Sequence, residues 1–267
     1  CNGTRLSDAL QTRTHLVIAE TGFGTGLNLM AVLAEQDRLN TSCQIDYISF
    51  EACPLSVDTI EKAHRPFREI SSFSEQMRAQ WPRRWPAVHS FQMGGGSVSV
   101  QLYYGRAETI LPHVNFNADI WFLDGFSPRR NPDFWSETVM NEVGRLSSDS
   151  ARLATFTVAS TVQSGLSSAG FMLEKRPGFG KKRDMLVAVK EISGRQKLSY
   201  SDRCEDVIII GAGIAGASIS YHLRVAGVQH LILDAGEKSY PPASRNPAGI
   251  VMPFLSVEET LASRLSI

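Results

Sequence analysis

Glu20-Thr21-Gly22-Phe23-Gly24-Thr25-Gly26 is a glycine-rich turn between an apolar run at residues 16–19 and a helical apolar pattern at residues 27–33. A second turn, Gly211-Ala212-Gly213-Ile214-Ala215-Gly216, also has an apolar run before it and a helical pattern after it. A strand, a glycine-rich turn and a helix in this order form the framework of nucleotide-binding sites in α/β folds. The two turns therefore predict two cofactor sites in one chain.

The first turn has the spacing of a site for S-adenosylmethionine (SAM). Gly22, Gly24 and Gly26 occupy alternate positions, so the backbone can pass close under a ligand that has no pyrophosphate. The carboxylate of Glu20 can take a cationic or amino group. Glu51 ends the next apolar run, where a carboxylate can accept hydrogen bonds from ribose hydroxyls. We expect these five residues to bind SAM.

The second turn has a different spacing. Gly211, Gly213 and Gly216 follow the G-x-G-x-x-G pattern, which directs helix-terminal amides at a pyrophosphate. Asp234 follows an apolar run at residues 231–233, where a ribose ligand is expected. Glycine turns also occur for purely structural reasons, but the strand, the helix and the acidic residue favour a dinucleotide here.

Apolar periodicity alternates between strand and helix patterns from residue 15 to about residue 157. This alternation predicts an α/β fold, with a parallel sheet and helices on both faces. Seven strands are expected, near residues 15–20, 44–50, 99–105, 118–124, 151–157, 171–176 and 184–190, the last two as an antiparallel pair. Helices are expected near residues 26–38, 55–66, 67–79, 134–146 and 160–169. The fold class is thus a Rossmann-like sheet of the SAM-dependent methyltransferase type, followed by the first βαβ unit of a second Rossmann domain.

Length and composition agree with two domains, since 267 residues with 43% hydrophobic content suffice for two buried cores. The polar stretch at residues 193–204 predicts a linker between a methyltransferase domain at residues 1–192 and a dinucleotide-binding domain at residues 205–267. The chain begins with Cys1 and ends about fifty residues after the second turn. We therefore expect a fragment whose truncated second domain folds poorly alone and holds its cofactor incompletely.

Composition also excludes several function classes. Lys and Arg total 27 and Asp and Glu total 27, so the net charge gives no argument for nucleic acid. No apolar stretch approaches the ~20 residues of a membrane span, and the start lacks a secretory signal. The four cysteines form no metal-ligand pattern. We expect a cytoplasmic monomer without a metal or a membrane partner.

The stretch from residue 118 to residue 135 carries the most chemistry. An apolar strand delivers Asp124 to the carboxyl edge of the sheet, where ligands bind in open α/β folds. The alternative for Asp124 is a structural role, in which it caps the following loop by accepting backbone N–H groups. Charge alone does not decide whether the basic clusters of the chain belong to solvated loops or contact phosphates. The clusters are formed by Arg129, Arg130, Lys181, Lys182 and Arg183.

The residue 118–135 stretch, with the segments at residues 19–28, 154–157 and 176–186, resembles the MnmC family of bifunctional tRNA-modifying proteins. The flavin-type turn that follows strengthens the resemblance, which covers nearly the whole chain. It implies a methyltransferase domain first and an FAD-dependent oxidoreductase domain second, both acting on the wobble uridine of tRNA. The flavin domain would remove the carboxymethyl group of 5-carboxymethylaminomethyl-2-thiouridine, and the methyltransferase would then methylate the resulting amine.

The same resemblance implies roles for individual residues. Asp124 would bind the amine and assist the loss of its proton, and the basic clusters would contact tRNA phosphates. The G-x-G-x-x-G turn and Asp234 would hold FAD. The chain departs from the family pattern at Arg106, where an acidic residue is frequent, and at Arg245, where glycine is expected.

Two other functions stay open at this point. One is a small-molecule N-methyltransferase fused to an unrelated flavin or nicotinamide oxidoreductase, which would act on free metabolites without tRNA. The other is a non-catalytic tRNA-binding scaffold, which a failure to bind SAM would favour.

Overall fold

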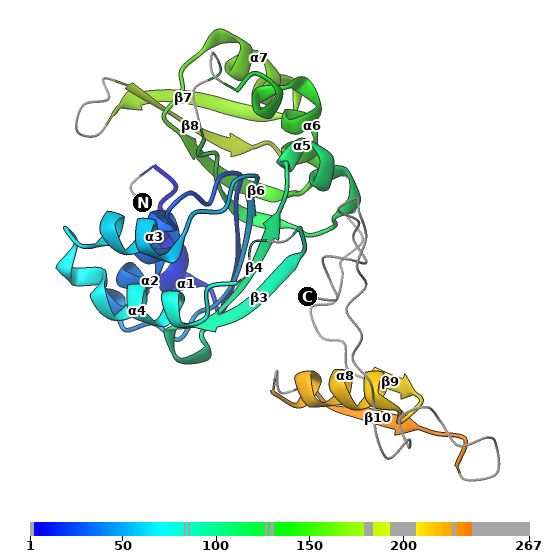
Figure 1. Ribbon diagram of the computed structural model, residues 1–267. Helices are drawn as coiled ribbons and strands as arrows, with labels where there is room; N and C mark the ends of the chain where they lie inside the picture. The colour runs from blue at the N-terminus through cyan, green and yellow to red at the C-terminus, as the bar shows by residue number, and fades with distance from the viewer. Residues whose placement is uncertain are drawn as a thin grey trace, which may run out of the picture. The chain divides into compact units, whose positions relative to one another are not determined.

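The chain divides into two compact units, Cys1–Ser193 and Gly194–Ile267, in the computed structural model (Figure 1). The structure describes residues 3–82, 84, 86–125, 128, 131–178, 184–192, 207–225 and 228–236. The residues predicted as a linker, 193–204, lie outside the described residues.

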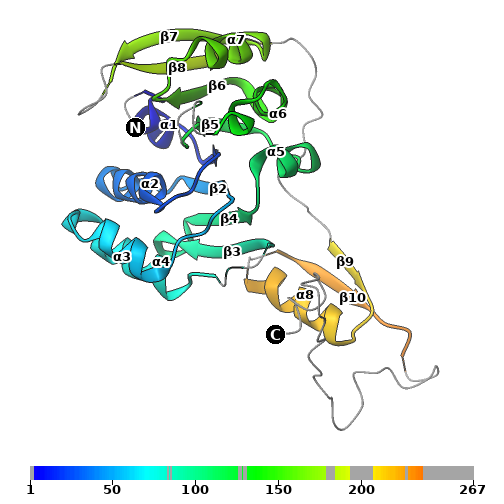
Figure 2. The same cartoon turned by 45° about the horizontal axis from the view of Figure 1, so that its top comes forward.

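An eight-stranded mixed sheet forms the centre of the first unit, in the order β3-β4-β2-β1-β5-β6-β8-β7 (Figure 2). Its strands are β1 (His15–Glu20), β2 (Gln44–Glu51), β3 (Val88–Met93), β4 (Val98–Tyr104), β5 (Ala118–Phe122), β6 (Ser147–Thr155), β7 (Phe171–Pro177) and β8 (Asp184–Lys190). The five strands β4, β2, β1, β5 and β6 pair in parallel. β8 pairs antiparallel with both β6 and β7. The predicted parallel sheet with a closing antiparallel pair is confirmed.

Helices cover both faces of this sheet, as the periodicity predicted. One face carries α1 (Leu6–Thr12), α2 (Leu27–Leu39), α3 (Val57–His64) and α4 (Ser71–Ala79), and the other carries α5 (Ala107–Ile110), α6 (Glu137–Arg145) and α7 (Ser160–Ser168) (Figure 2). Each face has its own buried apolar cluster, one including Leu29 and Met30 of α2 and the other Trp121 and Val143. Short 3-10 helices lie at Arg68–Ile70, Gly94–Gly96, Leu111–His113 and Asp133–Trp135.

The expectation of seven strands was wrong by one, because β3 adds an antiparallel edge strand beside β4. Only Phe91 and Met93 of β3 are buried, so its sequence shows little of the apolar alternation that marks a strand. The short helices α1 and α5 were also missed. α1 buries only Leu6 and Leu10, too few apolar positions for a clear helical period.

The described part of the second unit is a strand, a helix and a strand: β9 (Val207–Ile210), α8 (Ile214–Val225) and β10 (His230–Leu233). The two strands pair in parallel with four residues in register, which makes this segment a βαβ unit. Whether it folds poorly in isolation, as we expect, remains a prediction. Throughout the described residues, every helix is too short or too polar to cross a bilayer.

Candidate active site

A cavity of about 590 Å³ lies where the parallel strands of the first unit end. In the sheet β1 lies between β2 and β5, so the connections that follow β1 and precede β5 run to opposite sides of β1. A crevice opens beyond the carboxyl ends of these strands, as in other open α/β sheets. The residues that line it come from the first glycine turn, the end of β2, the loop after β4 and the end of β5. They include Gly22, Gly24, Asn28, Glu51, Glu108 and Asp124.

The glycines of the first turn are required by its backbone. A Cβ atom at Gly22 would overlap the carbonyl oxygen of Asp124, so only glycine allows the turn and the end of β5 to approach this closely. Gly24 and Gly26 have φ angles of 55° and 78°, in the left-handed region that side chains disfavour. Gly26 is the N-cap residue of α2. The turn therefore presents bare backbone to the cavity, as a close-fitting ligand requires.

Glu51 ends β2 and lies in the cavity wall, as predicted for the ribose ligand. Its Oε2 accepts the backbone N–H of Gly24 at 2.7 Å, and its Oε1 accepts that of Cys53 at 2.7 Å. These bonds fix the carboxylate between the glycine turn and the chain after β2. Each carboxylate oxygen can accept a second hydrogen bond, so the ribose role of Glu51 stays compatible with both contacts.

Glu20 lies behind the cavity rather than in its wall. Its side chain is fully buried, and Glu20 is not among the described residues that line the cavity. Its Oε1 accepts from Asn28 Nδ2 at 2.7 Å, while its Oε2 accepts from the hydroxyls of Tyr47 and Ser49, each at 2.9 Å. This arrangement therefore disfavours direct contact between Glu20 and the amino group of a ligand.

Burial raises the pKa of Glu20 from 4.5 to about 8, because the charged form loses its hydration. The three hydrogen bonds lower this pKa in part, and the negative charge of Asp124 raises it. At neutral pH the Glu20 side chain is therefore mainly the uncharged acid.

Asp124 stands two residues after β5 and lines the cavity, as the sequence predicted. Its Oδ2 accepts from Asn28 Nδ2 at 3.1 Å, so one amide nitrogen bridges Asp124 and Glu20. Its backbone carbonyl lies 3.5 Å from the Thr21 hydroxyl. The Asp124 carboxylate is thus held from the side of α2 and can act on a group inside the cavity.

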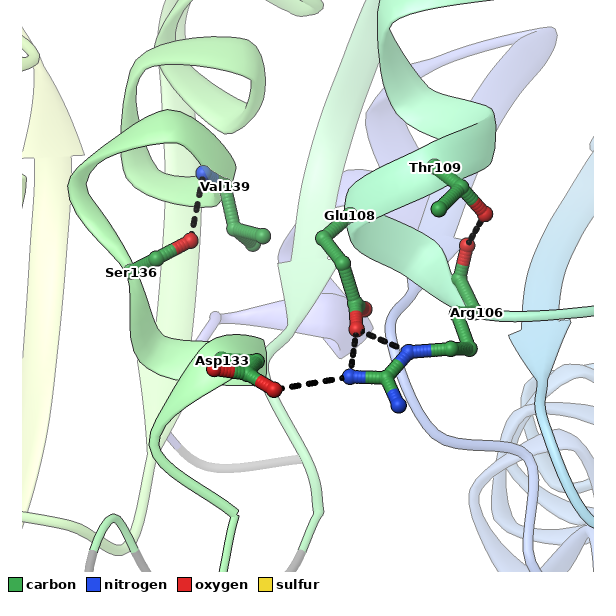
Figure 3. Close-up of polar contacts among 6 residues, drawn as sticks. All are labelled: Arg106, Glu108, Thr109, Asp133, Ser136 and Val139. Atoms are coloured by element: carbon green, nitrogen blue, oxygen red, sulfur yellow. Dashed lines mark hydrogen bonds and ion pairs between the residues drawn. The ribbon is translucent and has the colours of Figure 1, made fainter.

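Arg106 ties together two loops at the edge of the cavity (Figure 3). Its guanidinium forms an ion pair with Glu108, at the start of α5, and a second one of 2.9 Å with Asp133 in the loop after β5. Arg106 stands at the position where an acidic residue was expected from the sequence. The arginine joins the loop after β4 to the loop after β5, and Glu108 brings a carboxylate of the loop after β4 into the cavity wall.

Sequence reasoning missed Asn28, Tyr47 and Ser49 around Glu20. Asn28 stands in the first turn of α2. Tyr47 and Ser49 occupy alternate positions in β2, where Tyr47 pairs with Ile18 and Ser49 pairs with Glu20 of β1. A polar residue inside an apolar strand facing a buried carboxyl position is the signal that was available.

Five predicted residues cannot be placed. Arg129 and Arg130 after Asp124, and Lys181, Lys182 and Arg183 between β7 and β8, lie outside the described residues. Arg245 also lies outside them. The tRNA contacts assigned to the five basic residues remain predictions.

In the second unit, the predicted FAD residues gather at one end of the strand pair. Gly211 has a φ angle of 100°, and a Cβ atom at Gly216 would overlap the Gly211 carbonyl oxygen, so helix α8 packs closely on the turn. Asp234, just after β10, accepts the backbone N–H of Ala212 at 2.6 Å. Gly213 accepts from Ala217 N in the first turn of α8. The residues present fit the adenosine half of a dinucleotide.

Two protein families match the chain. Residues 68–191 match the family described as S-adenosyl-L-methionine-dependent methyltransferase, and residues 206–267 match the family described as FAD dependent oxidoreductase. The two matches lie on separate segments of the chain, the first within Cys1–Ser193 and the second within Gly194–Ile267.

Two curated relatives match along nearly the whole chain. Both have the name tRNA 5-methylaminomethyl-2-thiouridine biosynthesis bifunctional protein MnmC. The protein of Magnetococcus marinus is 38% identical over 95% of this chain, and that of Ralstonia nicotianae is 35% identical over 99%. The chain spans 40% and 41% of their respective lengths.

A solved structure has a similar fold. The crystal structure of MNMC2 from Aquifex aeolicus is 25% identical, with a TM-score of 0.57, over 70% of this chain and 57% of that protein.

We predict that Glu51→Ala weakens SAM binding by on the order of 1–3 kcal/mol, because the ribose loses hydrogen-bond acceptors and the Gly24 amide loses its partner. Isothermal titration calorimetry with SAM measures this. Glu137→Ala, an exposed position on α6, is the matched control and should bind like the parent. An unchanged dissociation constant for Glu51→Ala would remove Glu51 from the ribose site.

We also predict that Glu20 makes the chain less stable as pH rises. Its folded pKa, about 8, lies above the unfolded value of 4.5, so its stabilising contribution is complete below pH 4.5 and is lost as pH rises through 8. Glu20→Gln cannot ionise and should lose less stability between pH 5 and pH 9, by on the order of 1 kcal/mol or more. Urea unfolding across this range tests it; parallel stability curves for the two proteins would contradict the prediction.

Proposed function

We propose that this chain, which is related to the MnmC proteins along nearly its whole length, acts in the modification of the tRNA wobble uridine. Its first unit would use SAM to convert 5-aminomethyl-2-thiouridine to 5-methylaminomethyl-2-thiouridine. Its second unit would belong to an FAD-dependent activity that removes the carboxymethyl group of 5-carboxymethylaminomethyl-2-thiouridine. The alternatives, a small-molecule methyltransferase and a non-catalytic scaffold, are not favoured by these relatives.

The observation that carries the methyl-transfer proposal is the position of Asp124. It lies in the wall of the cavity beside the glycine turn, and Asn28 fixes its carboxylate. Glu51 and the turn would hold the nucleoside of the methyl donor on the other side. An acceptor that enters from the Asp124 side would then meet the donor in line, and most of the rate enhancement would come from this orientation.

Bound SAM supplies a methyl group on a sulfonium. The acceptor is a primary amine, which must be neutral to attack because its lone pair forms the new N–C bond. Asp124 would accept the proton that the nitrogen loses, and the C–S bond breaks as the N–C bond forms. Arg106, Glu108 and Asp133 would keep the two loops together around the acceptor.

The second unit supports the oxidoreductase part of the proposal through its residues. Gly211, Gly213, Gly216 and Asp234 would hold the adenosine and pyrophosphate of FAD, which supplies redox chemistry when bound. We further propose that the protein works in the cytoplasm as a monomer and requires no metal.

Mass spectrometry of tRNA nucleosides after incubation with the protein and SAM tests the proposal. We expect 5-methylaminomethyl-2-thiouridine to form from tRNA that carries the aminomethyl nucleoside. Methylation of free amines without any tRNA product would favour the small-molecule enzyme instead. Failure to bind SAM would favour the scaffold.

We predict that Asp124→Asn lowers the rate of methyl transfer by ~100-fold or more and leaves SAM affinity nearly unchanged. The amide keeps the shape and the oxygen that accepts from Asn28, but it cannot take the amine's proton. Single-turnover methylation of tRNA and calorimetry with SAM separate the two effects. Asp58→Asn, exposed on α3, is the control. Equal rates for Asp124→Asn and the parent would support the loop-capping role.

We predict that replacing Arg129, Arg130, Lys181, Lys182 and Arg183 by Ala weakens tRNA binding and flattens its salt dependence. Each phosphate that a basic side chain neutralises releases about one counterion, so the slope of log K against log salt should fall by about one for each such side chain that is replaced.

Filter binding at several salt concentrations gives this slope. The exposed residues Lys62, Arg65 and Arg68 provide a control variant that also lowers the net charge. If both variants keep the slope of the parent, the five residues belong to solvated loops.

A further inference from the structure

A continuous hydrogen-bond chain crosses the floor of the active site from β2 to the end of β5. The hydroxyls of Tyr47 and Ser49 donate to one oxygen of Glu20, and Asn28 donates to the other. The same Asn28 nitrogen donates to Asp124 at 3.1 Å. Glu20, Tyr47 and Ser49 are all fully buried, so this end of the chain is shielded from water, while Asn28 and Asp124 lie in the cavity wall.

We propose that Glu20 is a positioning residue for methyl transfer: it orients the Asn28 amide, which holds the Asp124 carboxylate toward the methyl-accepting amine. This inference rests on the proposed function for the role of Asp124, and it replaces the direct contact with SAM that the sequence suggested for Glu20.

The number of donors on Asn28 gives the first reason. Its amide nitrogen carries two N–H groups, and the two carboxyl groups use both of them. Without an acceptor at position 20, the N–H that points at the fully buried Glu20 carboxyl would lose its partner, and the amide would be free to turn. Because an unsatisfied buried donor is costly, the amide orientation depends on Glu20.

Charge gives the second reason. The titratable groups that face Glu20 are Tyr47 on β2 and Asp124 after β5, while Asn28 and Ser49 contribute neutral dipoles. Burial raises the pKa of Glu20 to about 8, so at neutral pH it accepts from Asn28 without adding a second negative charge beside Asp124. In the uncharged acid the proton belongs on Oε2, and one of the two hydroxyls there accepts it, whereas both hydroxyls donate to the ionised form.

Glu20→Leu and Glu20→Gln test this role kinetically. Leucine removes the acceptor and should lower kcat by about tenfold or more, with SAM affinity close to that of the parent, because Glu20 lies outside the cavity wall. Glutamine offers an amide oxygen to Asn28 and should restore most of the rate. The parent's kcat should change near pH 8 as Glu20 ionises, and this change should be absent in Glu20→Gln.

Two results would overturn the proposal. The first is a parent-like kcat in folded Glu20→Leu. The second is a loss of SAM affinity in Glu20→Gln as large as that in Glu51→Ala, which would place Glu20 at the ligand.

A titration that needs no tRNA covers the case in which Glu20→Leu does not fold. Carbon-13 NMR of the Glu20 carboxyl group should give a pKa near 8 in the parent, a lower value in Asp124→Asn and a higher value in Asn28→Leu. The first change removes a negative charge, and the second removes a hydrogen bond to the ionised form.

Identical titrations in all three proteins would overturn the proposed coupling. The expected shifts in a protein that does not methylate tRNA would contradict the proposed function while supporting the linked unit of Glu20, Asn28 and Asp124.

Discussion

The arrangement of the candidate active site depends on the hydrogen bonds of the buried Glu20 carboxyl group. It lies at the end of the central strand β1, and its partners come from β2 and α2, with Asp124 reached through Asn28. A carboxyl group without water must satisfy its oxygens within the protein, so each partner has a fixed place. The strand ends and the first turn of α2 are thereby set relative to one another before any ligand binds.

The two sides of the cavity are held by different physical means. Beneath the cavity, the fully buried Glu20 accepts from Asn28, and the same amide donates to Asp124 in the cavity wall. At its edge, exposed ion pairs of Arg106 join two loops, and solvent screens such pairs. The floor is therefore stiff, whereas the edge can yield. That division suits a site that holds a small cofactor precisely and admits a bulky acceptor from solvent.

Much of the fold follows from the sequence, because strands that bury many apolar residues, such as β1 and β2, show a clear apolar pattern. The three missed elements, β3, α1 and α5, bury few side chains, so edge pairing and tertiary contacts rather than local pattern specify them. Asp124 and Glu51 could be placed in the cavity from the rule that ligands bind at the carboxyl ends of parallel strands. The environment of Glu20 could not be predicted. Its burial depends on the packing of α2 and β2 around it, and the residue type at position 20 gives no indication of that packing.

The contact between Gly22 and the Asp124 carbonyl has a consequence for engineering. Because backbone meets backbone there, this side of the cavity cannot be enlarged by trimming a side chain. A redesign of the proposed methyl transfer for larger groups would have to gain its space elsewhere, at side chains such as Leu27 and Cys53 that line other parts of the cavity. One wall of the cavity is therefore formed by backbone that substitution cannot change, whereas other walls are formed by side chains that substitution can shorten.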